Sequence, residues 1–369
     1  MRVDFFNAIA QDAPFKEEIR AAVSRVLDSG RFVDGDETNK LEERLAKLNG
    51  VKYCALMSNG TSALETLLRC FDLDKGKNIL TPTNSFIATS SAISTVGSNP
   101  IFVDSDATCN IDLNLVEKEL KNGNIQGVLV VNLYGNPVEH EKLYELCIKY
   151  GVICLLDLAQ SHGTKYKENH PAQYCHGCAF SFYVTKVLGA YSESGCLLSN
   201  SKDVIDKAKS LRNHGRSTEN YSHQYLSSNL RGSEFSASVL NVKLNHLDYY
   251  YGERIKTTQE YNNYFSDYPE ILLKTTPNSE IVRYVYNIFV PQRDKLIEYL
   301  NKEDIGTNIH YPIIISEQKA YKHLRYVKEN FPVAHKQSQE TLSLPFWSGF
   351  PSKYAQIVSK KVIEFFKSN

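Results

Sequence analysis

The feature that most constrains the fold of this 369-residue chain is a series of short apolar segments separated by amphipathic helical segments. Continuous apolar runs of this length are typical of strands that are buried on both faces. The predicted strands are residues 51–57, 78–81, 100–104, 127–133, 152–156, 179–184 and 195–198. Strands that alternate with helices form a largely parallel sheet, and ligands bind at its carboxyl edge. The sequence therefore predicts an α/β fold with a site at that edge.

Amphipathic helices are predicted at residues 14–27, from about Asp36, and at 138–150, and Ser62 and Glu65 have the spacing of a capping box. Near residue 250 the alternation stops, and a charged, tyrosine-rich helix continues to about Phe265. The later segments are typical of a small α+β domain: strands at 281–290 and 307–310, and helices at 293–301 and 352–366. We expect a large domain, residues 1–250, and a small C-terminal domain, residues 251–369.

The composition is that of an ordinary globular protein, with 42% hydrophobic and 23% charged residues and a net charge of zero. The chain has no basic block, which disfavours a nucleic-acid partner. No apolar run approaches the roughly 20 residues that span a bilayer. The N-terminus lacks the pattern of a signal peptide. We therefore expect a cytoplasmic protein of enzyme size, with no membrane and no nucleic-acid partner.

The eight cysteines do not change this expectation. Most lie among aliphatic residues, where a free thiol behaves as a small hydrophobe. Cys175 and Cys178 have a CxxC spacing, but a structural zinc site needs a second ligand pair at similar spacing, and the sequence shows none. We expect no bound metal.

Residues 58–62 join a predicted strand to a predicted helix. Gly60 allows close approach of the backbone to a ligand, Thr61 supplies a hydroxyl group, and the free amides of the helix start favour an anion. An ordinary capped turn would have the same sequence.

Polar residues also follow the next buried strands. Asp157 ends an apolar strand, where a carboxylate needs a partner such as a pyridinium N–H or a structural cation. Gln160 follows three residues later as a hydrogen-bond donor or as a simple surface amide. Ser181 and Lys186 flank the end of another strand. A lysine that forms a Schiff base and an acid that keeps a pyridine nitrogen protonated are what pyridoxal phosphate chemistry requires. Phe86 would stack on the cofactor ring or fill the core.

Residues 59–64, 157–163 and 180–186, in this order, resemble the DegT/DnrJ/EryC1/StrS family of sugar aminotransferases. Residues 133–137, 211–215, 229–231, 309–312 and 342–345 match in register, so the resemblance runs from about residue 5 to the C-terminus. It implies the fold type I of pyridoxal-phosphate-dependent enzymes, with a mostly parallel mixed sheet between helices. It also implies a homodimer whose active sites lie at the subunit interface.

The resemblance assigns roles by position. Lys186 is expected to bond pyridoxal 5'-phosphate, Asp157 to pair with the pyridinium, Gln160 to contact the phenolic oxygen, and Phe86 to stack on the ring. The residues expected to hold the phosphate are Gly60, Thr61 and Ser181, with Asn229 from the partner subunit. His310 and Tyr311 are expected near the substrate.

The implied reaction moves the amino group of L-glutamate, through pyridoxamine phosphate, to a nucleotide-linked keto-sugar. We favour a dTDP-3-keto-6-deoxyhexose, giving an aminosugar for glycan or O-antigen biosynthesis. The alternatives are a UDP- or GDP-linked 4-keto sugar, or an inosose. A nicotinamide-dependent dehydrogenase is disfavoured because no GxGxxG follows an early strand. A regulatory protein without turnover is disfavoured because the lysine and the acid are both present.

Two further positions bear on the activity. Relatives that replace the lysine with histidine are dehydratases, so Lys186 favours transamination. The family pattern after the lysine is Gly-(Glu/Asp)-x-Gly, whereas this chain reads Ser192-Glu-Ser-Gly195. The extra side chain at Ser192 is expected to narrow or redirect this turn.

Overall fold

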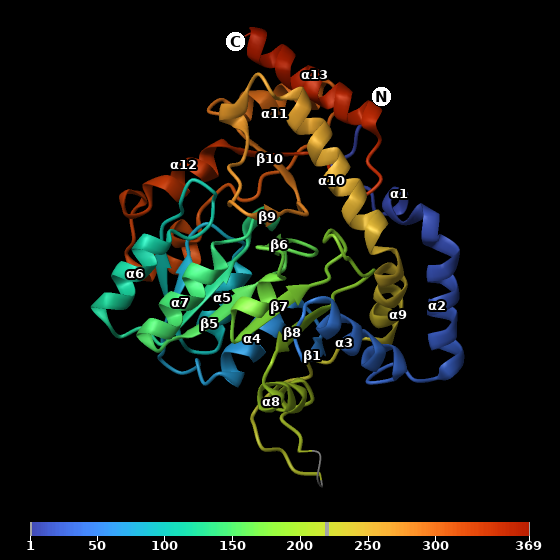
Figure 1. Cartoon of the computed structure of the whole chain (residues 1–369), viewed down its shortest axis with the longest axis vertical. Coiled ribbons are helices and arrows are strands. Elements are labelled where there is room, and N and C mark those ends of the chain that lie inside the picture. Colours follow the sequence, from blue (N-terminus) through green and yellow to red (C-terminus); the bar gives the residue numbers. More distant parts are fainter. Residues whose placement is uncertain (1, 218–220, 369) are drawn as a thin grey trace.

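The computed structural model describes residues 2–217 and 221–368. Its centre is a seven-stranded sheet in the order β1-β8-β7-β5-β4-β2-β3 (Figure 1). The strands are β1 (Tyr53–Met57), β2 (Asn78–Pro82), β3 (Asn99–Val103), β4 (Gly127–Val131), β5 (Ile153–Asp157), β7 (Gly177–Ser181) and β8 (Gly195–Ser199). β8 runs antiparallel to both its neighbours, and the other pairs are parallel. The predicted α/β fold with a mostly parallel mixed sheet is confirmed.

Helices cover both faces of this sheet, because the apolar strands are buried on both sides. One face packs against α3 (Asp36–Leu48), α6 (Leu113–Asn122), α7 (His140–Tyr150) and α9 (Glu234–Lys243). The opposite face packs against α4 (Gly60–Cys70), α5 (Ala88–Thr95) and α8 (Lys202–Arg212). The carboxyl ends of β1, β5 and β7 consequently open at one edge, toward the C-terminal part of the chain (Figure 1).

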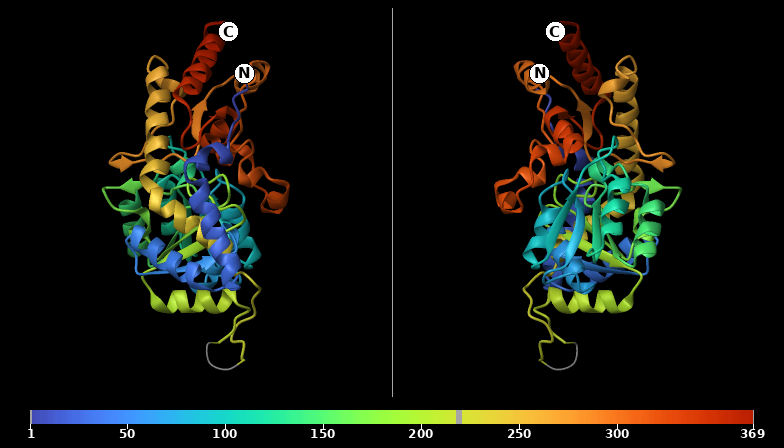
Figure 2. Two further views of the ribbon diagram at one scale, coloured as in Figure 1. Left: turned by 90° about the vertical axis from the view of Figure 1, so that its right-hand side faces the viewer. Right: turned by 90° about the vertical axis from the view of Figure 1, so that its left-hand side faces the viewer.

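The C-terminal part has a hydrophobic core of its own above the sheet (Figures 1 and 2). Its elements are α10 (Leu247–Tyr264), β10 (Tyr286–Phe289), α11 (Arg293–Lys302), α12 (Pro332–Glu340), β11 (Thr341–Leu344) and α13 (Ser352–Ser368). α10 reaches both cores, with Tyr250 in the sheet core and Tyr261 in the second. The predicted boundary at residues 250 and 251 falls inside this helix and stays a prediction.

The N-terminal segment joins the two cores. Val3 is buried in the second core and bridges to Ile305. α1 (Ala8–Asp12) and α2 (Lys16–Ser29) then follow the flank of α9 and α10 (Figure 1). Asp12 pairs with buried Lys243 of α9 at 2.7 Å. A two-stranded ribbon, β6 (Lys165–Tyr166) with β9 (Ser279–Glu280), adds a further connection. None of the helices in the described residues is long and apolar enough to span a membrane.

Two sequence-based predictions of local structure were wrong. The capping box of α4 is formed by Asn59 and Ser62, not by Ser62 and Glu65, because the helix begins at Gly60. Residues 307–310 do not form a strand: Asn308 makes a single bridge to Ser343, and β11 pairs with β10 instead. The chain bends away after Asn308, which brings His310 and Tyr311 toward the sheet edge.

Candidate active site

A cavity of about 900 Å³ opens at the carboxyl ends of β1, β5 and β7. Nine of the ten sequence-predicted site residues line it: Gly60, Thr61, Phe86, Asp157, Gln160, Ser181, Lys186, His310 and Tyr311. They come from five separate stretches of the chain. The convergence follows from the topology, since parallel strands end at the same edge.

The turn between β1 and α4 forms a cradle at the floor of this cavity. The Asn59 side chain accepts from the Ser62 N–H at 2.8 Å, and the Ser62 hydroxyl interacts with the Asn59 N–H and carbonyl. The Thr61 hydroxyl has no hydrogen bond within the described part of the chain and lines the cavity. An added Cβ at Gly60 would lie 2.8 Å from Ser181 Cβ. This backbone therefore sits as close to the end of β7 as glycine permits.

A buried histidine supports the end of β7 from behind. His162 Nε2 lies 2.9 Å from the Ser181 carbonyl, and its ring packs between Phe180 and Phe182. Burial lowers the pKa of His162 to about 4, so the ring is neutral at pH 7 and donates its Nε2 hydrogen. The Ser181 hydroxyl accepts from the Tyr183 N–H at 3.3 Å.

Asp157 ends β5 as a buried carboxylate. It accepts from the Thr89 hydroxyl at 2.8 Å and from the Ala159 N–H at 3.1 Å. Burial raises the pKa of Asp157, and these two hydrogen bonds and the Lys186 charge oppose that rise. Both hydrogen bonds come from neutral donors, so the carboxylate is suited to a further, cationic partner from the cavity side.

Gln160 is held in one orientation by its neighbours. Its Oε1 accepts from the Tyr134 N–H at 2.7 Å, and its Nε2 donates to the Tyr311 hydroxyl at 3.1 Å. The side chain is 2% exposed, so the reading of a surface amide is wrong. One Nε2 hydrogen is left for a ligand in the cavity.

The opposite wall of the cavity is aromatic. Phe86 is 52% exposed and lies 5.6 Å from the Tyr311 ring, so it does not fill the core. His310 is anchored through Nδ1 to the Ser343 hydroxyl at 2.8 Å, and burial lowers its pKa to about 4. Phe5 from the N-terminal segment lies 5.9 Å from the His310 ring and completes the wall.

Lys186 lies in the turn after β7 with its amine in the cavity. Its Nζ stands 4.1 Å from the centre of the Tyr284 ring. Sequence reasoning missed Tyr284 and Phe5 because neither belongs to a local pattern that points to a site. Tyr284 lies in the predicted strand 281–290, which in fact begins only at Tyr286.

The turn beyond Lys186 departs from the family pattern at Ser192. This side chain is exposed, and its neighbour Glu193 lines the cavity. The glycine at the end of the turn is required, because a Cβ at Gly195 would lie 2.4 Å from the Asn59 carbonyl carbon. The Ser194 hydroxyl is buried without a hydrogen-bond partner among the residues described.

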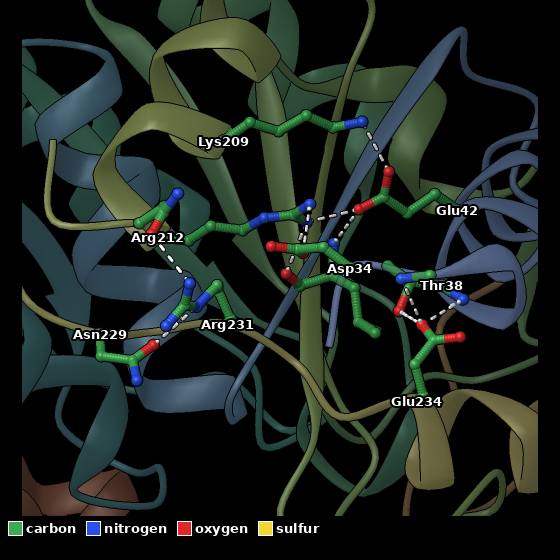
Figure 3. A network of polar contacts seen from close by, with 11 residues as sticks. Asp34, Thr38, Glu42, Lys209, Arg212, Asn229, Arg231 and Glu234 are labelled. Atoms are coloured by element: carbon green, nitrogen blue, oxygen red, sulfur yellow. Dashed lines mark hydrogen bonds and ion pairs between the residues drawn. The ribbon is translucent and has the colours of Figure 1, made fainter. Parts of the chain in front are cut away.

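Asn229, the tenth predicted residue, does not line the cavity that the described residues of its own chain form. Its segment is tied to the cradle, since the Ser58 N–H donates to the Leu230 carbonyl at 2.8 Å. Arg231 donates to Asn229 Oδ1 at 3.0 Å and to Asn213 Oδ1 at 3.0 Å (Figure 3). The Arg231 contact therefore occupies the amide oxygen, and the NH₂ group donates no hydrogen bond to the residues that the structure describes.

A network of charges centred on the buried side chains of Arg212, Glu42 and Glu234 holds this region together (Figure 3). Arg212 of α8 pairs with Glu42 of α3 and, at 3.1 Å, with Asp34, and Lys209 reaches the second oxygen of Glu42 at 2.6 Å. Glu234 of α9 accepts the N–H groups of Gly35, Glu37 and Thr38 at the start of α3. These contacts connect α8, before Asn229, and α9, after it, to α3.

The cysteines behave as core residues. All eight are free and buried. Burial raises the pKa of the Cys175 thiol well above its ordinary value. Within residues 2–217 and 221–368, no three His, Cys, Asp or Glu side chains converge as a metal site would require.

Comparison with known proteins identifies the family. The profile of the DegT/DnrJ/EryC1/StrS aminotransferase family matches residues 14–363. A Geobacillus stearothermophilus protein named pleiotropic regulatory protein is 31% identical and covers 100% of this chain and 99% of its own length. The dTDP-3-amino-3,6-dideoxy-alpha-D-galactopyranose transaminase of Aneurinibacillus thermoaerophilus is 32% identical, with 90% of each chain covered. Relatives of lower identity are named for UDP- and GDP-linked sugars.

The fold agrees with this likeness in sequence. The X-ray structure of DesV from S. venezuelae superposes with a TM-score of 0.94 at 30% identity, covering 99% of this chain and 98% of DesV. The match extends over the sheet, both cores and the cavity. The chain belongs to the DegT/DnrJ/EryC1/StrS aminotransferase family and is a fold type I transaminase that uses pyridoxal 5'-phosphate.

Proposed function

We propose that this transaminase moves the amino group of L-glutamate to a dTDP-linked 3-keto-6-deoxyhexose, making an aminosugar for glycan or O-antigen biosynthesis. The observation that carries the proposal is the convergence of Lys186, Asp157 and the cradle around Gly60 on one cavity. The Aneurinibacillus relative, named for a dTDP-linked 3-amino sugar, supports this choice of acceptor. Eight free, buried cysteines are in keeping with a cytoplasmic location.

The residues present fit the cofactor. The start of α4 and the close approach of Gly60 to Ser181 make a small anion site, and the unpaired Thr61 hydroxyl suits a phosphate oxygen. Asp157 suits a pyridinium nitrogen, because its two present donors are neutral. Phe86 would cover the ring, Gln160 would donate to the phenolic oxygen, and Lys186 would hold the aldehyde carbon.

When bound, pyridoxal 5'-phosphate supplies an aldehyde that accepts the amino group and a ring that withdraws electrons from the reacting carbon. Lys186 Nζ would act as base and then as acid within each half-reaction: it would take the proton from the donor's α-carbon and give a proton up before that half ends, and the same transfers would run in reverse for the acceptor. The negative charge of the Asp157 carboxylate would face the ring nitrogen and keep that nitrogen protonated throughout. Phe5, Phe86 and Tyr311 line the cavity as an aromatic wall and would limit the access of water to the reacting carbon.

A homodimer is part of the proposal. Residues 213–217 and 221–228, after α8, extend away from the body (Figure 2), and among them Tyr221 is 81% and Leu226 95% exposed. A partner subunit packed on these two side chains would remove their apolar surface from water. Asn229, which directly follows residue 228, would then contribute its NH₂ group to the phosphate site of the partner subunit.

Two experiments test the proposal. Glutamate should change the visible absorbance of the purified holoenzyme, and Lys186→Ala should abolish both this change and product formation, whereas Lys202→Ala, an exposed control on α8, should not. A Lys186→Ala protein that still turned over glutamate and keto-sugar would contradict the assignment.

The acceptor needs a separate measurement. Products are analysed with glutamate and a set of dTDP-, UDP- and GDP-linked 3-keto and 4-keto sugars, together with an inosose. We expect the highest kcat/KM with a dTDP-linked 3-keto-6-deoxyhexose. A higher kcat/KM with a UDP- or GDP-linked 4-keto sugar, or with the inosose, would show that this compound is the acceptor. The assignment of the protein as a transaminase would not change.

A further inference from the structure

Tyr284 makes a contact with the reactive lysine that neither the sequence patterns nor the family resemblance assigned. Its ring centre lies 4.1 Å from Lys186 Nζ, and both side chains line the cavity. An ammonium group at this distance from an aromatic face is attracted by the ring quadrupole, and the attraction is stronger where water is excluded. Tyr284 is 8% exposed, so the contact is largely shielded from solvent.

The position of this ring is determined by three hydrogen bonds from different parts of the molecule. The Tyr284 N–H donates to the Tyr134 carbonyl at 3.1 Å, and the Tyr284 carbonyl accepts from Arg254 Nη1 at 2.8 Å. The hydroxyl lies 2.9 Å from the hydroxyl of Thr185, the residue before Lys186. The ring and the lysine are therefore held against each other from both sides.

Arg254 is unusual as a fully buried cation whose acceptors are all neutral among the residues described. Besides the Tyr284 carbonyl, it donates to the Arg283 carbonyl at 3.2 Å, the Gln11 side chain at 3.3 Å and the Ser348 hydroxyl at 3.1 Å. Burial lowers the pKa of Arg254 to about 10, which leaves it charged at pH 7. A buried charge held in this way fixes the backbone at residues 283–284 rather than pairing with an acid.

We propose that Tyr284 is a catalytic residue that binds the ammonium group of Lys186 whenever the lysine is not bonded to the cofactor. The ring keeps Nζ in the cavity and holds its proton for return to the substrate, and no bond is made or broken at the tyrosine. Arg254 and Thr185 are positioning residues for the ring. This inference rests on the proposed role of Lys186.

The test uses the equilibrium between the pyridoxal and pyridoxamine forms of the holoenzyme, read from their absorbance at fixed glutamate and 2-oxoglutarate. The lysine is free in the pyridoxamine form, so loss of the ring should shift the equilibrium toward the pyridoxal form. For Tyr284→Leu we expect a shift of about 2- to 30-fold. Tyr284→Phe keeps the ring and should leave the equilibrium unchanged. General damage to the fold would affect both forms alike.

Two further variants distinguish the contribution of the Tyr284 ring from that of its hydroxyl group. Thr185→Val removes the same hydrogen bond as Tyr284→Phe, so the two should slow the half-reaction equally while preserving its equilibrium. Trifluorophenylalanine at position 284 keeps the shape of phenylalanine but weakens the ring quadrupole. It should shift the equilibrium toward the pyridoxal form, as Tyr284→Leu does. If the leucine variant does not fold, the fluorinated variant tests the same prediction.

A second measurement uses the cofactor-free protein. Acylation of Lys186 by an amine-reactive reagent, followed by peptide mass spectrometry, should be at least about twofold faster in Tyr284→Leu, because the ring holds Nζ at 4.1 Å and covers one side of it. Equal equilibria and equal acylation rates in wild type, Tyr284→Leu and the fluorinated variant would overturn the inference. Failure of wild type to respond to glutamate would instead overturn the proposed function.

Discussion

The two walls of the active-site cavity are built in different ways. The polar wall consists of the cradle at Gly60, Asp157, and the turn from Ser181 to Lys186, each of which lies at or just beyond the carboxyl end of a strand of the sheet. The aromatic wall consists of Phe5, Phe86, Tyr284, His310 and Tyr311, none of which lies in a strand or an α-helix. These residues are held by side chains that are distant in sequence, chiefly Arg254 and Ser343.

The difference shows what holds the residues of each wall in position. A parallel sheet places the residues after its strands at one edge, so the polar wall needs little support beyond the sheet core. The aromatic wall instead depends on buried polar contacts between the two cores. We therefore expect variants in the polar wall to lose activity without losing stability, and variants that support the aromatic wall to lose stability.

Asp157→Asn should have the largest effect on activity. Loss of the charge opposite the cofactor nitrogen should lower kcat/KM by about 10²–10³-fold. Because burial raises the pKa of Asp157, removing the charge should leave the cofactor-free protein equally stable or more stable in urea. A variant that lost stability but retained activity would contradict the distinction between the walls.

Arg254→Met should show the reverse pattern. It removes four buried hydrogen bonds and should reduce the free energy of unfolding by about 2–4 kcal/mol, measured by urea denaturation. Arg283→Met is the matched control, since this neighbouring arginine is also buried but its Nη1 has no hydrogen-bond partner in the described chain. Equal losses in the two variants would show that burial alone, rather than the contacts of Arg254, supports the wall.

Buried histidines make stability depend on pH. The pKa of His162 is about 4 in the folded protein and about 6.5 when unfolded, so the unfolded state binds the extra proton between these values. Stability is thus lost as pH falls from about 6.5 to 4, with about 2 kcal/mol lost by pH 5 from this group. His162→Gln should flatten the dependence of the melting temperature on pH in this window. An unchanged slope would show that His162 does not contribute.

Glycine substitutions give the smallest expected effects and test the cradle directly. Gly60→Ala places a methyl group 2.8 Å from Ser181 Cβ and should weaken pyridoxal phosphate binding by about tenfold, measured by cofactor titration. Gly252→Ala, in α10, meets no atom within 4 Å and should stabilise the protein by about 0.5–1 kcal/mol without affecting the cofactor. Unaltered cofactor affinity in Gly60→Ala would show that the approach to Ser181 is not needed.

Most of the polar wall could be predicted because its signals are local. Asp157 follows an apolar run, and the cradle lies between a strand and a helix. The aromatic wall has no such local signal: the family resemblance, rather than a strand pattern, points to Phe86, His310 and Tyr311. The sequence around Phe86 is equally compatible with a core position. Tyr284 and Phe5 belong to no local sequence pattern that points to a site, because their positions depend on contacts with residues far away in the sequence. The expected strand at 307–310 failed for a similar reason: β11 pairs with β10, which no local propensity specifies.

The amino-acid sequence by itself determined the α/β architecture, the reactive lysine with its acid, and the family of transaminases. These follow from strand periodicity and from residues placed directly after strands, which any parallel sheet brings to one edge. The tertiary structure alone decided which aromatic rings face the lysine, that Gln160 is fixed by Tyr134 and Tyr311, and that Arg254 supports the wall. Such contacts depend on how two separately packed cores meet, and that fit is set by side-chain volume and buried hydrogen bonds rather than by local pattern.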